Sequence, residues 1–288
     1  AIIAAAKNGM YGYTRVSEDV IESYLRWQQR RNGWSAAADW FRFTPGVVTA
    51  INLLLLSETE EGDEVLIQRP VYYPFADSIQ QQKRTVVNSP LHLKNGRYEI
   101  DFEDFEQKTA SPQCKAFILS NPHNPVGRVY TEEELRRLGE ICLKHHVFVI
   151  ADEIHSDLIF PGHRHVVFAS LGRDYAENCA VCHAPSKTFN LAGLSFSCIL
   201  IPNQARRERF DRMFARYCRA HPNFFAPVAA KAAWDYGEDW LNSCLSYIQK
   251  NDQFVREFAE NTWHGDVWIS PLEGTYLQWI DFRKLEPD

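Results

Sequence analysis

The sequence predicts an α/β fold built around a mostly parallel β-sheet. Three short apolar runs, at residues 116–120, 147–151 and 179–183, have the length and composition of buried strands. Each run ends abruptly in polar residues, and a helical pattern separates the first two, as in a βα unit. Because ligands of open α/β sheets bind beyond the carboxyl ends of the strands, we expect a functional site at this edge.

Composition limits the classes of function. The chain has 288 residues, of which 45% are hydrophobic, enough for a large core, and its net charge of −6 provides no basic face for nucleic acid. No apolar run approaches the length of a membrane span. The seven cysteines are odd in number and lie mostly in apolar runs, so we expect reduced core thiols in a cytoplasmic protein. Cys179-x-x-Cys182 has metal or redox spacing, but it has no second pair and lies within a predicted strand.

The N-terminal half alternates predicted helices and strands. Residues 1–6 read as the end of a helix whose beginning is absent, and a turn over residues 9–15 follows. Ser17 is a predicted N-cap, and Gly33 closes the helix that it opens. Further elements are expected as strands at 40–43, 64–68 and 84–88 and as a helix at 47–56.

The C-terminal half contains clear turn and capping signals. Asn95-Gly96 predicts a hairpin turn, and Thr131-x-x-Glu134 is a capping box that opens a helix through residue 145. Residues 203–263 read as helices, with one break bracketed by Pro222 and Pro227 and another at Gly237. Strands at 267–270 and 275–282 would begin a smaller α+β domain, so we divide the chain into residues 1–240 and 241–288.

Lys187 is the residue around which we organise the functional prediction. It follows the apolar run 179–183, and a lysine buried at the end of a strand loses solvation, which lowers its pKa and makes the amine a nucleophile. Taken alone, the pattern favours an exposed lysine in a polar turn, because surface lysines are the commoner kind. Asn124 and Asp152 follow the two other buried runs in the same way, so all three groups could converge at one edge of the sheet.

A metal centre is the competing interpretation of these polar residues. Asp152, Glu153, His155 and Asp157 offer oxygen and nitrogen ligands within six residues, and His163-x-His165 offers two more nitrogens. None of these spacings matches a known metal motif. We therefore predict no metal site.

The residues at this edge resemble the landmarks of fold-type I pyridoxal-phosphate (PLP) enzymes. Asn124-Pro125-Val126-Gly127, Asp152 and Ser186-Lys187 correspond to three such landmarks. The longer runs are similar to the cystathionine β-lyase-type (C–S lyase) branch of the class I/II aminotransferase superfamily; they are residues 43–48, 68–75, 121–128, 152–157 and 186–194. The resemblance covers almost the whole chain. It implies a three-layer α/β/α large domain with a mostly parallel, mixed sheet, PLP as cofactor and a homodimer with a shared active site.

The resemblance also implies a role for each site residue. Lys187 would form the imine with PLP, Asp152 would keep the pyridine nitrogen protonated, and Asn124 would donate to the phenolate oxygen. His155 would lie near the same oxygen, and of the tyrosine pair one would stack on the ring and the other lie near the lysine; we assign Tyr72 to the cofactor and Tyr73 to catalysis, although the sequence leaves their order open. The phosphate would be held by Gly46, Val47, Val48, Ser186 and, from the partner subunit, Tyr13.

Two departures from the family pattern bear on cofactor affinity and activity. Many relatives carry a basic or amide residue eight positions after the lysine, where this chain has Ser195. The family also continues beyond the position of Asp288 and carries there an arginine that clamps the substrate carboxylate, which nothing here matches. Relatives also begin earlier than Ala1, so we expect a fragment, a truncated product or an ordered part of a longer chain.

The predicted reaction is β-elimination from a sulfur-containing amino acid. Lys187, once displaced by the substrate, would take the Cα proton as general base, a thiolate would leave from Cβ, and hydrolysis would give pyruvate and ammonia. An aminotransferase acting on an amino acid and a 2-oxo acid would use the same residues. A regulatory protein that keeps the fold and acts through protein contacts is the third hypothesis.

Overall fold

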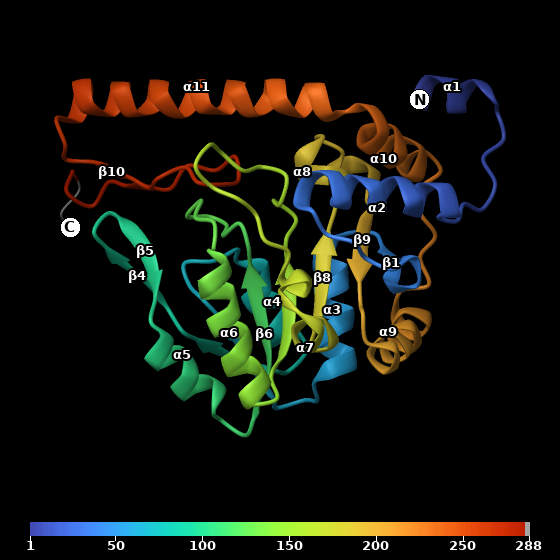
Figure 1. Cartoon of the computed structure of the whole chain (residues 1–288), viewed down its shortest axis with the longest axis horizontal. Helices are drawn as coiled ribbons and strands as arrows, with labels where there is room; N and C mark the ends of the chain where they lie inside the picture. Colours follow the sequence, from blue (N-terminus) through green and yellow to red (C-terminus); the bar gives the residue numbers. More distant parts are fainter. Residues whose placement is uncertain (286–288) are drawn as a thin grey trace.

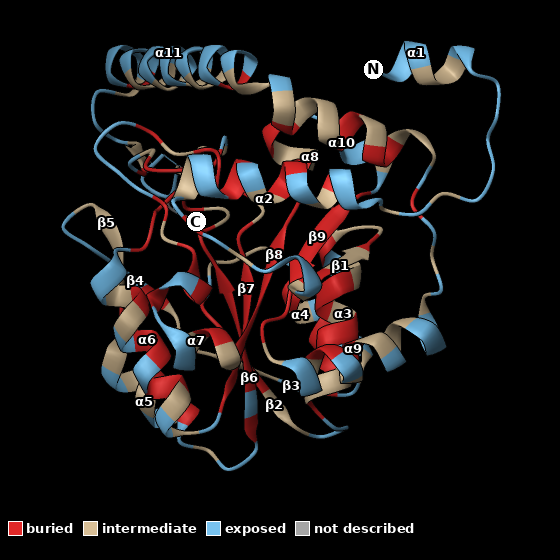
Figure 2. Ribbon diagram, turned by 45° about the vertical axis from the view of Figure 1, so that its right-hand side comes forward, coloured by how far each residue is buried: buried red, intermediate tan, exposed pale blue. Residues whose placement is uncertain are grey.

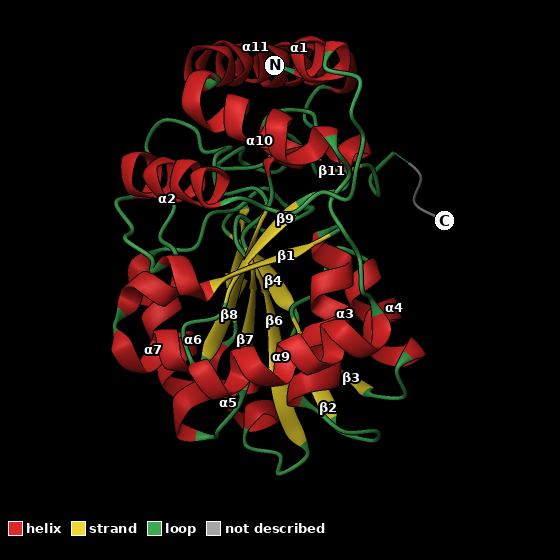
Figure 3. Cartoon of the chain, turned by 90° about the vertical axis from the view of Figure 1, so that its right-hand side faces the viewer, coloured by secondary structure: helices red, strands yellow, loops and turns green. Residues whose placement is uncertain are grey.

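The computed structural model describes residues 1–285 and contains a seven-stranded sheet between two layers of helices (Figure 3). The strand order is β1-β9-β8-β7-β6-β2-β3. Pairs within β8-β7-β6-β2-β3 are parallel, whereas β9 pairs antiparallel with both β8 and β1. The strands span Phe41–Thr44 (β1), Glu64–Ile67 (β2), Thr85–Asn88 (β3), Cys114–Ser120 (β6), Phe148–Asp152 (β7), Cys179–His183 (β8) and Ser197–Leu200 (β9). The predicted α/β class with a mixed, mostly parallel sheet is confirmed.

Successive residues of the central strands feed two separate cores. In β7, Val149 and Ala151 belong to one apolar cluster, while Phe148 and Ile150 belong to the other. This alternation follows from the two-residue period of a strand, which sends neighbouring side chains to opposite faces. A strand buried on both faces has to be apolar throughout, which explains the uninterrupted runs in the sequence. Figure 2 shows the buried strands between helices with exposed outer faces.

Helices cover both faces of the sheet (Figure 3). The second cluster packs under α3, α4 and α9, which contribute Leu54, Phe75 and Phe210. The first cluster packs under α2, α5 and α6, which contribute Trp27, Phe105 and Leu138. The α-helices span Ile2–Lys7 (α1), Glu18–Asn32 (α2), Val47–Glu58 (α3), Pro74–Gln81 (α4), Phe102–Thr109 (α5), Glu132–Lys144 (α6), Arg173–Glu177 (α7), Pro185–Thr188 (α8), Gln204–Tyr217 (α9), Phe225–Tyr236 (α10) and Glu238–Trp263 (α11).

Several of these helix and turn boundaries agree with local capping and turn signals. Thr131 and Glu134 form the predicted capping box at the start of α6, and Gly33 ends α2 in the left-handed conformation. The predicted hairpin is present as β4 (Leu91–Lys94) and β5 (Arg97–Ile100), with positive φ at Asn95 and Gly96.

Other predictions about the C-terminal part need correction. The helical break does not extend to Pro227, which lies in the first turn of α10, where a missing N–H costs no helical hydrogen bond. The two predicted strands shrink to the two-residue pair β10 (Trp268–Ile269) and β11 (Ile280–Asp281). Helix α11 crosses the expected division at residue 240 and extends along one side of the molecule (Figure 1).

The structure bears on two further points raised by the sequence, a paired role for Cys179 and Cys182 and the absence of a membrane span. Cys179 and Cys182 lie three residues apart in β8 and therefore face opposite cores, so these two free thiols cannot act together. Burial raises the pKa of both thiols well above its ordinary value. Within residues 1–285, none of the helices has the length and apolarity that a membrane span requires.

Candidate active site

A cavity of about 920 Å³ opens at the carboxyl ends of β2, β6, β7 and β8. Every predicted site residue except Tyr13 contributes to its walls. Those residues are Gly46, Val47, Val48, Tyr72, Tyr73, Asn124, Asp152, His155, Ser186 and Lys187, and Ser195 joins them. Tyr13 is 95% exposed and packs against His221 instead. The convergence that the sequence predicted for groups from distant segments is therefore present.

Asp152 is the last residue of β7 and presents a buried carboxyl group to the cavity. Burial raises its pKa from 3.8 to about 7, and the nearby Lys187 opposes that rise. One carboxyl oxygen, Oδ1, accepts from the backbone N–H of Ile154 at 3.1 Å. Oδ2 has no protein donor within residues 1–285, so this oxygen is available to a cationic or N–H-bearing ligand.

Lys187 lies in the short helix α8, directly after β8. Its side chain lines the same cavity as Asp152 and is half-buried, less deeply than the buried lysine that the sequence predicted. The helical turn that follows the strand holds the lysine at the cavity wall. An amine in such a position can reach a ligand within the cavity.

The start of α3 offers backbone N–H groups to the cavity. Gly46 is the N-cap of α3 and has no side chain that could cap the helix. A Cβ atom placed on Gly46 would meet no atom within 4 Å, so the space beside it is open. Val47 and Val48 follow in the first turn, whose amides have no partner within the helix. Ser186 and Ser195 also line the cavity, so it offers hydroxyl and backbone N–H donors that suit an anion.

The tyrosine pair differs in exposure. Tyr72 is half-buried, burial raises its pKa, and the charge of Lys187 opposes that rise. Tyr73 begins α4 and is 75% exposed, although its ring lies 5.6 Å from that of Tyr72. Tyr72 is therefore the phenol within electrostatic reach of the lysine, a distinction that the sequence could not make.

His155 is a buried imidazole at the cavity wall. It is 3% exposed, and burial, followed by the charge of Lys187, lowers its pKa to about 3. Its Nδ1 has no hydrogen-bond partner among the described residues. A buried nitrogen without a partner is costly, and a ligand in the cavity could relieve that cost.

Comparisons with known proteins identify the family. The family model described as aminotransferase class I and II matches residues 2–287. The chain belongs to this family.

Similar proteins and similar solved structures are consistent with this family. The chain is 42% identical to cystathionine beta-lyase PatB of Bacillus subtilis (strain 168) over 275 residues, covering 96% of this chain and 71% of that protein. A PLP-bound putative aminotransferase from Clostridium difficile 630 matches with a TM-score of 0.96 and 40% identity, covering 99% and 73% of the two chains. The PLP-bound C–S lyase from Staphylococcus hominis matches with a TM-score of 0.93 and 32% identity, covering 99% and 74%.

One wall of the cavity was not predicted from the sequence of this class I and II aminotransferase family member. Tyr276 and Trp279, from the C-terminal segment, line the cavity together with Ser120 and Arg69. The Tyr276 ring meets His155 edge-on at 5.5 Å. The sequence predicted this segment only as the entry into a smaller domain, because the contact between His155 and Tyr276 is long-range and leaves no local pattern.

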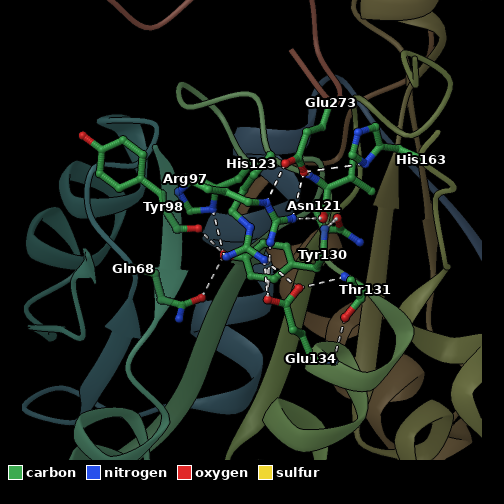
Figure 4. A network of polar contacts seen from close by, with 12 residues as sticks. Gln68, Arg97, Tyr98, Asn121, His123, Tyr130, Thr131, Glu134, His163 and Glu273 are labelled. Atoms are coloured by element: carbon green, nitrogen blue, oxygen red, sulfur yellow. Dashed lines mark hydrogen bonds and ion pairs between the residues drawn. The ribbon is translucent and has the colours of Figure 1, made fainter. Parts of the chain in front are cut away.

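Glu273 anchors that C-terminal wall. Its carboxylate accepts from Arg97 Nε at 2.6 Å (Figure 4) and from the backbone N–H of Val129 at 2.8 Å. The backbone N–H of Gly274 donates to Gly127 O at 2.8 Å, in the loop that carries Asn124. The hairpin, the Asn124 loop and the C-terminal segment are therefore joined next to the cavity.

The residues proposed for a metal centre divide between two sides of the β7 turn. Asp152 and His155 line the cavity, whereas Glu153 and Asp157 are buried outside it. Glu153 lies close to His165 and His183, a set that could in principle hold a metal. Both ring Nε2 atoms make hydrogen bonds to Glu153 Oε2, at 2.9 and 3.0 Å, which accounts for the cluster without an ion.

Proposed function

We propose that this chain is a PLP-dependent C–S β-lyase that cleaves cystathionine- or cysteine-type amino acids to a thiol, pyruvate and ammonia. The proposal is supported by the 42% identity to a protein named cystathionine beta-lyase and by the similarity to a PLP-bound C–S lyase. The observation that carries it is that Asn124, Asp152 and Lys187 line one cavity together with the start of α3.

The cavity residues fit PLP chemically. Asp152 offers an oxygen without a protein donor, and His155 Nδ1 is buried without a partner. The open space beside Gly46 and the unpaired amides of Val47 and Val48 suit a phosphate group. The flat faces of Tyr72 and Tyr73 suit a pyridine ring. A cofactor with an aldehyde, a ring nitrogen and a phosphate would therefore find a complementary group for each.

Each residue then has a defined task. When bound, PLP supplies an electron sink that stabilises negative charge at the substrate Cα. Lys187 would hold the cofactor through its aldehyde, and its free amine would accept the Cα proton of the substrate. Asp152 would keep the ring nitrogen protonated, while Asn124 and His155 would hydrogen-bond to the phenolate oxygen. Val48, Ser186 and the largely exposed Tyr73 line the rest of the cavity.

Asp152 is suited to this task by its high pKa. With a pKa of about 7, the buried carboxyl group is divided between its protonated and ionised forms near neutral pH. A cationic ring nitrogen beside it would favour the carboxylate, because opposite charges in a buried site attract strongly. The ion pair would then form only with the cofactor in place.

We also propose a homodimer in which the partner subunit's Tyr13 completes the phosphate end. This is supported by the 95% exposure of Tyr13, which is not among the described residues that line its own cavity. The segment that carries it connects α1 and α2 at the edge of the molecule (Figure 1). In this proposal residues 1–240 form the cofactor domain and residues 241–288 begin the smaller one. The molar mass by light scattering and the PLP affinity of Tyr13→Phe test it. A wild-type protein that is monomeric in solution, or a Tyr13→Phe variant that binds PLP as tightly as the wild type, would contradict the proposal.

The function is tested with purified protein, PLP and cystathionine. Borohydride reduction followed by mass spectrometry should locate PLP on Lys187, and pyruvate should appear without an added 2-oxo acid. Lys187→Ala should lose both signals, because Lys187 is the only lysine among the described residues that line the cavity. Pyruvate formation at the wild-type rate in that variant would refute the assignment.

An aminotransferase is the second candidate, supported by the similarity to a PLP-bound putative aminotransferase. It would use the same cavity residues, with the proton returned to the cofactor. Dependence of turnover on an added 2-oxo acid, without pyruvate release from cystathionine alone, would favour it over the lyase.

A further inference from the structure

Two buried carboxylates flank the Lys187 segment from the side of the sheet that faces α2. Glu153 and Asp157 belong to the turn after β7, the same turn that presents Asp152 and His155 to the cavity. Glu153 is fully buried and Asp157 is 6% exposed, yet neither lines the cavity. Buried carboxylates are costly unless they accept hydrogen bonds, so their partners indicate their purpose.

Glu153 holds the chain on the N-terminal side of the lysine. Its Oε2 accepts from His183 Nε2 at 3.0 Å, and its backbone N–H donates to Cys182 O at 3.0 Å. His183 is the last residue of β8, four positions before Lys187. Burial raises the pKa of Glu153, but its contacts with His165 and His183 outweigh that effect and bring the pKa to about 2. Glu153 is therefore an ionised acceptor.

Asp157 holds the chain on the C-terminal side. Its Oδ2 accepts from Thr188 Oγ1 at 2.8 Å, and Thr188 directly follows Lys187. Its Oδ1 accepts from Trp27 Nε1 at 3.0 Å. The lysine thus lies between two anchored neighbours, and both anchors belong to the turn that carries Asp152.

Helix α2 supports both anchors from behind. Tyr24, 1% exposed, donates its hydroxyl to His183 Nδ1 at 2.6 Å, with the tautomer set by the bond from Nε2 to Glu153. Trp27, fully buried one turn further along, reaches Asp157. One rigid helix therefore fixes both carboxylate partners, and large aromatic side chains leave little room for either to move.

We infer that Glu153 and Asp157 are positioning residues that fix the amine of Lys187 relative to the carboxyl group of Asp152. The inference rests on the proposed function, in which the amine must reach both the cofactor aldehyde and the substrate Cα. Their role is geometric: they touch neither group and act through His183 and Thr188. Misplacing a reacting group by about 1 Å can cost on the order of a hundredfold in rate.

Thr188→Val tests the C-terminal anchor, because it removes the hydroxyl and keeps the shape. The protein is stripped of cofactor, mixed with PLP and quenched with borohydride at intervals, and the mass of the Lys187 peptide gives the rate of attachment. We expect attachment and kcat to slow about tenfold, with KM within about threefold of wild type. Thr188→Ser should restore both rates to within about twofold, because it returns the donor to Asp157.

Thr109→Val is the matched control. Thr109 is also buried and its hydroxyl also makes one hydrogen bond, to Phe105 O at 2.6 Å, but it lies in α5 outside the cavity. Tyr24→Phe probes the other anchor by removing the hydroxyl that holds His183. Urea unfolding and far-UV circular dichroism check that each variant is folded. If Thr188→Val does not fold, Tyr24→Phe tests the positioning role by itself.

The outcomes separate the two proposals. Slow attachment in Thr188→Val or Tyr24→Phe, with normal attachment in Thr109→Val and rescue by Thr188→Ser, supports the positioning role. Wild-type attachment rates and kcat in folded Thr188→Val and Tyr24→Phe overturn it while leaving the proposed function intact. Failure of the wild-type protein to attach PLP at Lys187 overturns the proposed function and the positioning role with it.

Discussion

Replacement of Asp152 by asparagine should change the pH dependence of stability in a direction set by burial. The folded-state pKa of about 7 lies above the ordinary value of 3.8. Without cofactor, the folded protein therefore keeps a proton that the unfolded chain has released. The contribution of Asp152 to stability is complete below about pH 4 and is lost as the pH rises toward 7. Asp152→Asn keeps the shape of the side chain and removes this titration.

The size of the effect follows from the pKa difference. Between about pH 5 and the folded-state pKa of about 7, each pH unit corresponds to about 1.36 kcal/mol. The wild-type protein should therefore lose about 2.7 kcal/mol relative to Asp152→Asn between about pH 5 and pH 8, with no further change above. Water in the cavity reaches one side of the carboxyl group and would reduce this value, so about 2 kcal/mol is the expected measurement.

Urea unfolding of the two cofactor-free proteins at about pH 5 and pH 8 measures this difference. Taking the difference between variant and wild type cancels the titration of all other groups that do not interact with Asp152. Addition of PLP should shift the difference in favour of the wild-type protein, because the carboxylate would stabilise a protonated ring nitrogen and ligand binding adds to stability. A difference between the two proteins that stays constant from pH 5 to pH 8 would refute the burial argument.

Two further predictions concern the C-terminal wall of the cavity. Glu273→Gln should lower the free energy of unfolding by about 1 to 3 kcal/mol, because Arg97 loses its ionised acceptor; an unchanged urea midpoint would contradict this. Gly274→Ala should cost about 1 to 3 kcal/mol and raise KM, because its Cβ would lie 2.8 Å from Pro122 Cβ. Gly193→Ala, whose Cβ would meet nothing within 4 Å, is the control and should stay within about 0.5 kcal/mol of wild type.

The sequence by itself determined the parts of the protein that depend on local physics. The apolar runs at β6, β7 and β8 are buried on both faces and had to be continuous, and polar residues that line the cavity stand at the end of each strand or within a few positions after it. The capping box of α6 and the Asn95-Gly96 turn are likewise written in a few neighbouring residues. These signals need no knowledge of what packs against them.

Only the tertiary structure decided what surrounds those groups. It left Lys187 half-buried, separated the roles of Tyr72 and Tyr73, and brought Tyr276 to the cavity from the C-terminal segment. It also turned Glu153 away from the cavity toward His183. Burial and pKa depend on every segment that packs around a group. Such long-range contacts leave no periodic pattern in the sequence, so they become visible only when the chain has folded.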